Sequence, residues 1–397
     1  MTKNVRFDLF IRNEREAELA ERSDRLAAHF AERSAQHDTE GSFPFNNFAD
    51  LREAGYLQLT VPRAYGGEEA SLYELVLAQE RLARGDGSTA LAVGWHVGLL
   101  HQLRFTNAWP ASLYERFCQE AVETGALVNH LASERATGSP SRGGRPETKA
   151  VAAEGGWLLS GRKTYSTLSP ILACFTVSAA IEGTEETGDF FVRVGPGVRV
   201  EETWNTLGMR ATGSHDVVLE NVFVPEDQVI HLSGAPRKER TPDEGGWLLH
   251  IPACYIGIAY AARSFAIHFA QQYRPNSLTT PIAELPNIRR QIGEMDIALT
   301  TARTVLYSVA DRWDREPERR AALKPELGLA KHVATNHAIA IVDTAMRIVG
   351  AASLSRSLPL ERMYRDVRAG LHNPPMDDVV VNGMAQRALD EVKQIMK

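Results

Sequence analysis

Two neighbouring segments of this chain carry residues that could hold a flat ligand with a polar rim. HLASERATGS, from His130 to Ser139, is rich in hydroxyl groups and ends near a glycine, and WLLSGRKTYST, from Trp157 to Thr167, is a strand pattern that ends in an aromatic residue and two hydroxyls. Glycine lets backbone N–H groups approach a ligand. An aromatic face beside a hydroxyl can stack on a ring and donate to its edge. Together the two segments predict a cradle for a heterocycle such as a flavin.

The spacing within the second segment predicts which side chains face the ligand. Alternate residues of a strand share a face, so Lys163, Tyr165 and Thr167 are expected on one side. The first segment is too polar for a core, and Gly138 would allow its main chain to come close to a phosphate or a ring edge. An ordinary β-turn followed by an edge strand would have the same composition.

Isolated histidines and one loop supply further candidates for catalytic and substrate-pocket residues. His96 lies in an apolar helical pattern, where a hydrogen-bonded core histidine is the usual outcome, and His372 precedes Asn-Pro-Pro in a loop. His130 could line the pocket or be an ordinary strand residue. Arg210 and Ser214, on either side of Gly213, could bound a substrate cavity or build a structural turn.

Metal and disulfide chemistry are not expected. His332 and His337 are five residues apart on a helical pattern and do not share a face. The chain has three cysteines, far apart and without CxxC spacing, so neither a disulfide framework nor a zinc site is implied.

Length and charge bound the class of protein. A chain of 397 residues with 44% hydrophobic and 24% charged residues should bury a large core in two or three domains. A net charge of −6 offers no general attraction to nucleic acid or anionic membranes. The N-terminus is charged almost at once, and no run approaches the ~20 apolar residues of a membrane span. We therefore expect a cytoplasmic protein that binds neither nucleic acid nor membrane.

The periodicity predicts an α+β chain in three parts. Residues 1–125 carry helical patterns, with Ser71 placed to begin one helix. Residues 126–235 consist of short runs of β-branched and aromatic residues, with a hairpin turn at Gly155-Gly156. In residues 236–397 four helical segments are expected to form a bundle, at 247–273, 287–313, 326–349 and 377–396. No GxGxxG turn follows a strand, so a Rossmann dinucleotide site is not supported.

Four segments in this order of domains resemble the acyl-CoA dehydrogenase superfamily over nearly the whole chain. SERATGSP, Ser133–Pro140, is similar to the family's T-E-P-x-A-G-S-D loop, and KTYST, Lys163–Thr167, is similar to its K-x-W-I-T strand. LGMRATGSHDVVLENVFVPED, Leu207–Asp227, resembles the strand that leads to V-P, and LPLERMYRDVR, Leu358–Arg368, resembles P-x-E-R-x-Y-R-D. Four motifs in the same order and spacing are a specific match.

The resemblance implies an acyl-CoA dehydrogenase-like fold with an N-terminal helical domain, a middle β-barrel or sandwich and a C-terminal four-helix bundle, assembled as a homotetramer. It implies a flavin, FMN or FAD, held by Leu131, Ser133, Ser139, Tyr165 and Thr167. By this likeness Ser133 contacts the pyrimidine edge, Tyr165 flanks the ring and Thr167 lies near N5.

Two departures from the family pattern affect the expected chemistry. The family's glutamate base follows the R-D pair in a Y-E-G-T sequence, whereas this chain reads RDVRAGLHNPPMDD, with His372 and Asn373 there. A second base position of the family aligns near Trp247, which is not an acid either. The stretches that hold the FAD adenosine keep only Arg274 and Gly350, which makes FMN plausible.

In these two departures the chain resembles the flavin monooxygenase branch of the family, which includes dibenzothiophene monooxygenase. LHNP, Leu371–Pro374, resembles that branch's L-H-[DN]-P, and GWH, Gly94–His96, resembles its G-[YF]-H. The likeness implies catalytic roles for His96 and His372, because a histidine can donate to developing charge as an O–O bond breaks. His130, Arg210, Ser214 and Asn373 are then candidates for the substrate pocket.

Three functions follow as hypotheses. The first is a monooxygenase that acts on a small organic substrate with O2 and reduced flavin from a separate flavin reductase. The second is an FAD-dependent acyl-CoA dehydrogenase that desaturates an acyl-CoA, with Asp377 or Asp378 as a displaced base and an electron-transferring flavoprotein as partner. The third is a non-catalytic family member.

Overall fold

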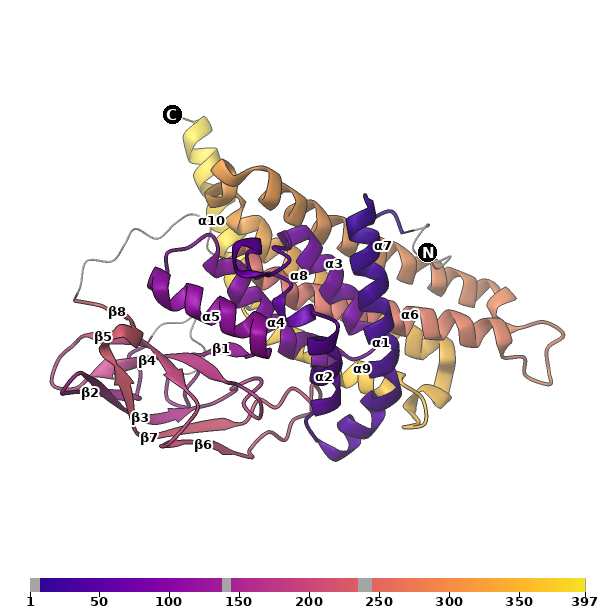
Figure 1. Cartoon of the computed structure of the whole chain (residues 1–397). Helices are drawn as coiled ribbons and strands as arrows, with labels where there is room; N and C mark the ends of the chain where they lie inside the picture. The colour runs from indigo at the N-terminus through magenta and orange to yellow at the C-terminus, as the bar shows by residue number, and fades with distance from the viewer. Residues whose placement is uncertain (1–7, 138–143, 235–244, 397) are drawn as a thin grey trace.

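A computed structural model describes residues 8–137, 144–234 and 245–396 of the chain (Figure 1). Helices form the first part of the chain. Asn13 caps the first helix by accepting from the Glu16 N–H, and Ser71 caps the third in a capping box with Glu74. The predicted start at Ser71 is therefore confirmed. The helices are α1 (Glu14–Glu40), α2 (Phe45–Glu53), α3 (Leu72–Ala83), α4 (Gly87–Leu103) and α5 (Ala111–Thr124).

The middle part is one mixed sheet below the helices in Figure 1. Its strands are β1 (Val128–Leu131), β2 (Lys149–Ala153), β3 (Gly156–Lys163), β4 (Cys174–Ile181), β5 (Thr187–Arg193), β6 (Val198–Glu201), β7 (Asp216–Pro225) and β8 (Val229–Leu232). They lie in the order β6-β7-β3-β2-β4-β5-β8, and β1 pairs with β4 in parallel. The predicted hairpin joins β2 to β3, with Ala153 opposite Gly156 and Gly155 at a φ of +74°.

Helices return after the sheet and pack on the first part. They are α6 (His250–Gln272), preceded by the 3-10 turn η6 (Gly246–Leu249), α7 (Pro286–Arg315), α8 (Arg320–Val349), α9 (Leu360–Val367) and α10 (Asp377–Ile395). The short α9 lies within the P-x-E-R-x-Y-R-D-like motif and was not predicted as a helix. The helix α10, expected in the bundle, buries only Val380.

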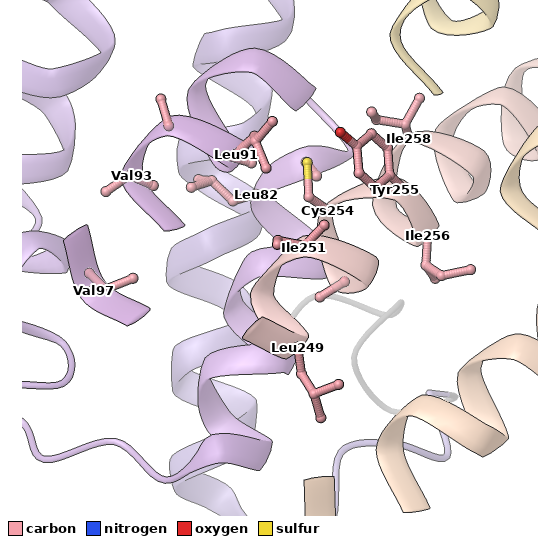
Figure 2. Close-up of a cluster of buried hydrophobic side chains, with 14 of the residues drawn as sticks. Leu82, Leu91, Val93, Val97, Leu249, Ile251, Cys254, Tyr255, Ile256 and Ile258 are labelled. Carbon is pink, nitrogen blue, oxygen red and sulfur yellow. The ribbon is translucent and has the colours of Figure 1, made fainter. Parts of the chain in front are cut away.

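One core joins the three parts. It contains residues of α3, α4 and α6 together with strand residues such as Phe175 and Val192. Figure 2 shows the cluster between α3, α4 and α6, with Leu82, Leu91 and Ile251 among its members. A Cβ on Gly257 would lie 2.2 Å from the Glu80 carbonyl oxygen, so α6 can approach α3 this closely only with glycine there.

Among the residues that the structure describes, one helical stretch, Pro317–Leu354, is long and apolar enough to span a membrane by length and composition, with a mean hydropathy of 1.3. No such run was expected from the sequence, because Lys331, His332 and Asn336 interrupt the apolar residues. Its main element, α8, packs against α6 and α7, as the core helix of a bundle does.

Candidate functional site

A buried ion pair fixes the polar loop to the end of β3. The Lys163 ammonium donates to Glu134 Oε1 at 2.5 Å and to the Ser178 carbonyl oxygen at 2.8 Å. The side chains of Lys163 and Glu134 are 0% and 1% exposed. Burial alone would raise the pKa of Glu134, but the bonds from Lys163 and Thr148 outweigh it, so this pKa lies below its usual value. The loop is thereby fastened to β3 at Glu134.

Tyr165 lies just beyond the strand, in a turn. The strand β3 ends at Lys163, and Tyr165 has a φ of +54°, in the left-handed region. The prediction that Lys163, Tyr165 and Thr167 share one strand face is therefore wrong, because the chain turns after Lys163. The turn leaves the Tyr165 ring 68% exposed, with its edge against Trp204 at 5.6 Å between ring centroids. One face of this ring is available to a flat ligand.

A chain of hydroxyl groups lies beside this ring. Thr167 Oγ1 is 2.8 Å from Ser214 Oγ, which is 2.7 Å from Thr212 Oγ1. The Asn129 amide donates to the Thr167 carbonyl oxygen at 3.0 Å and holds the turn. Ser166 Oγ is buried and has no hydrogen-bond partner among the described residues. An orphaned hydroxyl beside an exposed aromatic ring is what a ligand with a polar rim would satisfy.

The structure separates the remaining predicted cofactor residues. Ser133 is partly exposed at the loop, and its carbonyl oxygen accepts from the Thr164 N–H at 2.9 Å. Leu131 is 2% exposed and its side chain packs in the hydrophobic core, so its predicted contact with the cofactor would have to come from the main chain. Ser139 lies outside the described residues.

Two predicted pocket residues, Arg210 and His130, make hydrogen bonds within the protein. Arg210 donates from Nε to the Asp38 carbonyl oxygen at 2.6 Å and from a terminal nitrogen to the Thr206 carbonyl oxygen at 3.0 Å. It therefore fastens the loop after β6 to the end of α1. His130 alternates with Asn129 along β1, so it points away from the Thr167 turn, and its Nδ1 lies 2.7 Å from Thr176 Oγ1. Neither residue joins the hydroxyl chain, whereas Ser214 does.

His96 has the placement of a core residue. It is fully buried, with Nε2 3.0 Å from the Leu57 carbonyl oxygen, while Nδ1 accepts from the Val128 N–H at 3.1 Å. Burial lowers its pKa to about 4, so the ring is neutral. Both nitrogens are occupied by main chain, which favours a structural role over the expected catalytic one.

His372 and Asn373 follow α9 in a turn. His372 is exposed, and Asn373 Oδ1 accepts from the Tyr255 hydroxyl at 2.5 Å. Asp377, proposed as a displaced base, is held by α8: Asn336 donates to its Oδ2 at 3.0 Å, and His332 Nδ1 lies 3.1 Å from its Oδ1. The carboxylate therefore serves to attach α10 to α8.

An aromatic cluster that includes a buried histidine was not predicted from the sequence. The Trp247 ring stacks on His250 at 5.6 Å, and Trp95 meets the same imidazole edge-on at 5.0 Å. A Cβ at Gly94 would lie 2.4 Å from His250 Cδ2, and one at Gly98 would lie 2.8 Å from the Trp247 ring. The two glycines, one helical turn apart, were the available sequence signal.

The imidazole of His250 is held in one orientation. Its Nδ1 lies 2.8 Å from the Trp247 carbonyl oxygen, while its buried Nε2 has no partner among the described residues. Burial lowers the pKa of His250 to about 4. The neutral ring therefore donates from Nδ1 and leaves a free acceptor at Nε2.

Helix α9 is tied to the sheet side of the site. Asp366 Oδ1 accepts from the Met209 N–H at 2.6 Å, and Arg365 donates to the Leu207 carbonyl oxygen at 2.9 Å. This places the R-D pair of the fourth motif against the loop that leads to Ser214. No group of three or more metal-binding side chains is arranged for a metal within the described part of the chain.

Comparisons with known proteins agree with the three-part architecture. The models of the N-terminal, middle and C-terminal domains of acyl-CoA dehydrogenases match residues 13–108, 130–222 and 249–371. A putative acyl-CoA dehydrogenase, YdbM, of Bacillus subtilis (strain 168) is 47% identical over 96% of this chain and 99% of its own length.

More distant relatives include a nitrososynthase and a monooxygenase by name. The amino sugar nitrososynthase RubN8 of Streptomyces rubradiris is 30% identical over 89% of this chain and 84% of its own. A probable FMNH2-dependent monooxygenase, SfnC, of Pseudomonas putida is 25% identical over 89% and 90%. The structure of KijD3 with FMN and an amino-keto sugar nucleotide superposes with a TM-score of 0.82 at 26% identity, covering 95% of this chain and 94% of that one.

The motifs, the fold and these matches lead to one assignment, although the family contains several reactions. Its members are flavin-dependent oxidoreductases, and the matches cover 84–99% of the length of the three named relatives. The chain belongs to the acyl-CoA dehydrogenase family.

Proposed function

We propose that this protein is a monooxygenase that uses reduced flavin and O2 to oxidise a small organic substrate. The observation that carries the proposal is the turn after α9, where an acyl-CoA dehydrogenase would carry its base. His372 and Asn373 stand there, and the next carboxylate, Asp377, is occupied by Asn336 and His332 of α8. Proton abstraction next to a thioester needs a base within hydrogen-bond reach of the carbon.

The residues around Tyr165 fit a flavin, and FMN is our proposal. Tyr165 would flank the ring, Thr167 and Ser214 would meet its polar edge, and the free Ser166 hydroxyl would gain a partner. A bound reduced flavin supplies the electrons that activate O2. FMN is favoured over FAD because only Arg274 and Gly350 remain of the two adenosine-binding stretches, and because KijD3 at 26% identity holds FMN.

His372 and Asn373 are the proposed polar groups of the reacting side. The exposed imidazole of His372 can donate to oxygen, and the Tyr255 hydroxyl holds Asn373 by donating to its Oδ1. His250, with its free Nε2 between Trp95 and Trp247, can accept a hydrogen bond from a substrate N–H or O–H. We propose these groups as the polar contacts of the substrate.

The electron source and assembly are proposals of the same kind. A separate flavin reductase would supply the reduced flavin in the cytoplasm. A homotetramer would cover apolar side chains left on α10, among them Val381, Leu389 and Val392, each more than half exposed.

The second candidate is an FAD-dependent acyl-CoA dehydrogenase that passes electrons to an electron-transferring flavoprotein. The 47% identity to a putative acyl-CoA dehydrogenase favours it. Two measurements on the purified full-length chain separate the candidates: identification of the released flavin, and anaerobic titration of the flavin-loaded protein with acyl-CoAs of increasing length. We expect FMN, or weakly held flavin, and no bleaching. Bound FAD that is bleached by an acyl-CoA would establish the dehydrogenase.

A further inference from the structure

A small cavity lies between η6, α8 and the Pro374-Pro375 turn, and none of its lining residues belongs to the flavin cradle. Its volume is about 280 Å³, roughly nine times the liquid volume of a water molecule. Leu248, Leu249 and Leu327 supply aliphatic walls, and the two prolines close one side. A cavity of this size can hold a single ring or a short branched chain.

A buried cation stands in the wall of this cavity. Lys331 is 1% exposed, and its Nζ has no hydrogen-bond partner among the described residues. The nearest anion is Asp377 Oδ1 at 3.6 Å, beyond hydrogen-bond distance. An ammonium group has three donors, and leaving a buried charge without hydrogen bonds is costly.

Other side chains of α8 also bind the Asp377 carboxylate and keep it from approaching Lys331 more closely. Its Oδ2 accepts from Asn336, and its Oδ1 also faces His332 at 3.1 Å. The carboxylate is thus shared among three side chains of α8. Lys331 keeps donor capacity on the side of the cavity.

A second lysine of α8 marks the outer end of the same wall. Lys324 lines the cavity seven residues before Lys331, two helical turns away on the same face, and is exposed. The wall therefore runs from an outer cation over aliphatic side chains to an inner, desolvated cation. The arrangement suits an anion with an apolar body better than a neutral hydrocarbon or a highly charged phosphate.

We propose that this cavity binds a small monocarboxylate with a hydrocarbon body, such as an aromatic or branched-chain acid. Its carboxylate accepts from the Lys331 ammonium, and its body packs against Leu248, Leu249 and Leu327. A hydrogen bond between charged groups is stronger than a neutral one. The ligand therefore competes with Asp377 for Lys331.

The test is calorimetric titration of the purified full-length chain with benzoate, benzamide and acetate as probes. Because burial lowers the pKa of Lys331, the titration is run at about pH 6, well below the ordinary lysine pKa. Benzoate should bind at least about tenfold more tightly than neutral benzamide, as a charge-assisted hydrogen bond requires. Acetate, which lacks the body, should bind more weakly than benzoate. Equal affinities for benzoate and benzamide would overturn the proposal.

Three variants locate the site. Lys331→Met should weaken benzoate binding about tenfold or more, whereas Lys393→Met, which removes an exposed lysine of α10 remote from the cavity, should leave it unchanged. Leu327→Phe should fill the cavity and abolish binding of both ring probes.

Asp377→Asn keeps the test decisive if Lys331→Met fails to fold. It removes the competing carboxylate while the new amide can still meet Asn336, so benzoate binding should tighten several-fold. Unchanged or weaker binding in Asp377→Asn, or an equal loss in Lys393→Met, would contradict the assignment.

Discussion

The ion pair between Lys163 and Glu134 should decide whether the flavin cradle keeps its shape. We consider Lys163→Met, which removes the ammonium but nearly preserves the volume of the side chain. Lys163 Nζ donates to Glu134 and to the Ser178 carbonyl oxygen, and both ionic side chains are at most 1% exposed. Removing one partner leaves a buried carboxylate that keeps only the bonds from Thr148 and the Glu147 N–H.

The expected loss follows from that burial. Breaking a buried pair by removing one partner costs about 3–5 kcal/mol, because the remaining charge is uncompensated. An exposed pair of the same type, Lys149 with Glu182 at 3.5 Å, should cost at most about 1 kcal/mol in Lys149→Met. The lowered pKa of Glu134 adds a pH signature: its stabilising contribution is present above the carboxyl's unfolded pKa and is lost as pH falls through the lower folded value.

Urea unfolding followed by circular dichroism, and FMN titration followed by flavin fluorescence, measure the two consequences. Lys163→Met should lower the free energy of unfolding and weaken FMN binding, because the loop at Ser133 loses its anchor. The double variant Glu134→Gln, Lys163→Met should be less destabilised than the sum of the two single variants, by up to about 3 kcal/mol. A Lys163→Met protein as stable as Lys149→Met, or additive single variants, would refute the reasoning.

Three other predictions concern the core and the helix contacts. His96→Gln should lower the free energy of unfolding by about 2–3 kcal/mol, because it disturbs the hydrogen bonds to Leu57 and Val128, and should leave turnover per flavin-loaded molecule unchanged. A large loss of turnover without a loss of stability would instead support a catalytic role for His96. Gly94→Ala should destabilise by about 1–3 kcal/mol in thermal unfolding, because its Cβ meets His250, whereas Gly383→Ala, in open space on α10, should stabilise slightly. Burial raises the pKa of Asp366 to about 7, so the free energy of unfolding should fall by up to ~4 kcal/mol as pH rises from about 4 to about 7. Melting temperatures measured across this pH range should show the fall, and Asp366→Asn should remove it. An unchanged pH dependence in Asp366→Asn would show that Asp366 is not its source.

The helices and the order of the domains could be predicted from the sequence because local patterns determine them. In α8 the apolar residues recur at steps of three and four, a local pattern typical of one buried helix face, and all five are buried: Ala334, Ala338, Ile341, Ala345 and Ile348. The cap at Ser71 and the glycine turn after β2 were also local signals. The exposed surface of α10 was not predictable, since its pattern resembles that of a packed helix.

The site depended on contacts between distant segments and on backbone conformation. Glu134 and Lys163 are 29 residues apart, and their pairing needs the loop after β1 to lie against β3. The left-handed φ of Tyr165 turns its ring out of the strand, which alternation cannot show. His96 looked catalytic by resemblance, but its partners come from Leu57 and Val128, 39 and 32 residues away.

Our central proposal is that this protein brings reduced flavin and O2 together at the Tyr165 cradle, and that His372 and Asn373 stand where an acyl-CoA dehydrogenase carries its carboxylate base. Its most direct test is to mix the anaerobic complex of protein and reduced FMN with oxygenated buffer in a stopped-flow instrument and to record the absorbance of oxidised FMN as it reappears. We predict that the oxidised spectrum returns after a lag and in more than one phase, and that His372→Ala alters the slow phase. Immediate return in one phase, at the rate of free reduced FMN, would contradict the account.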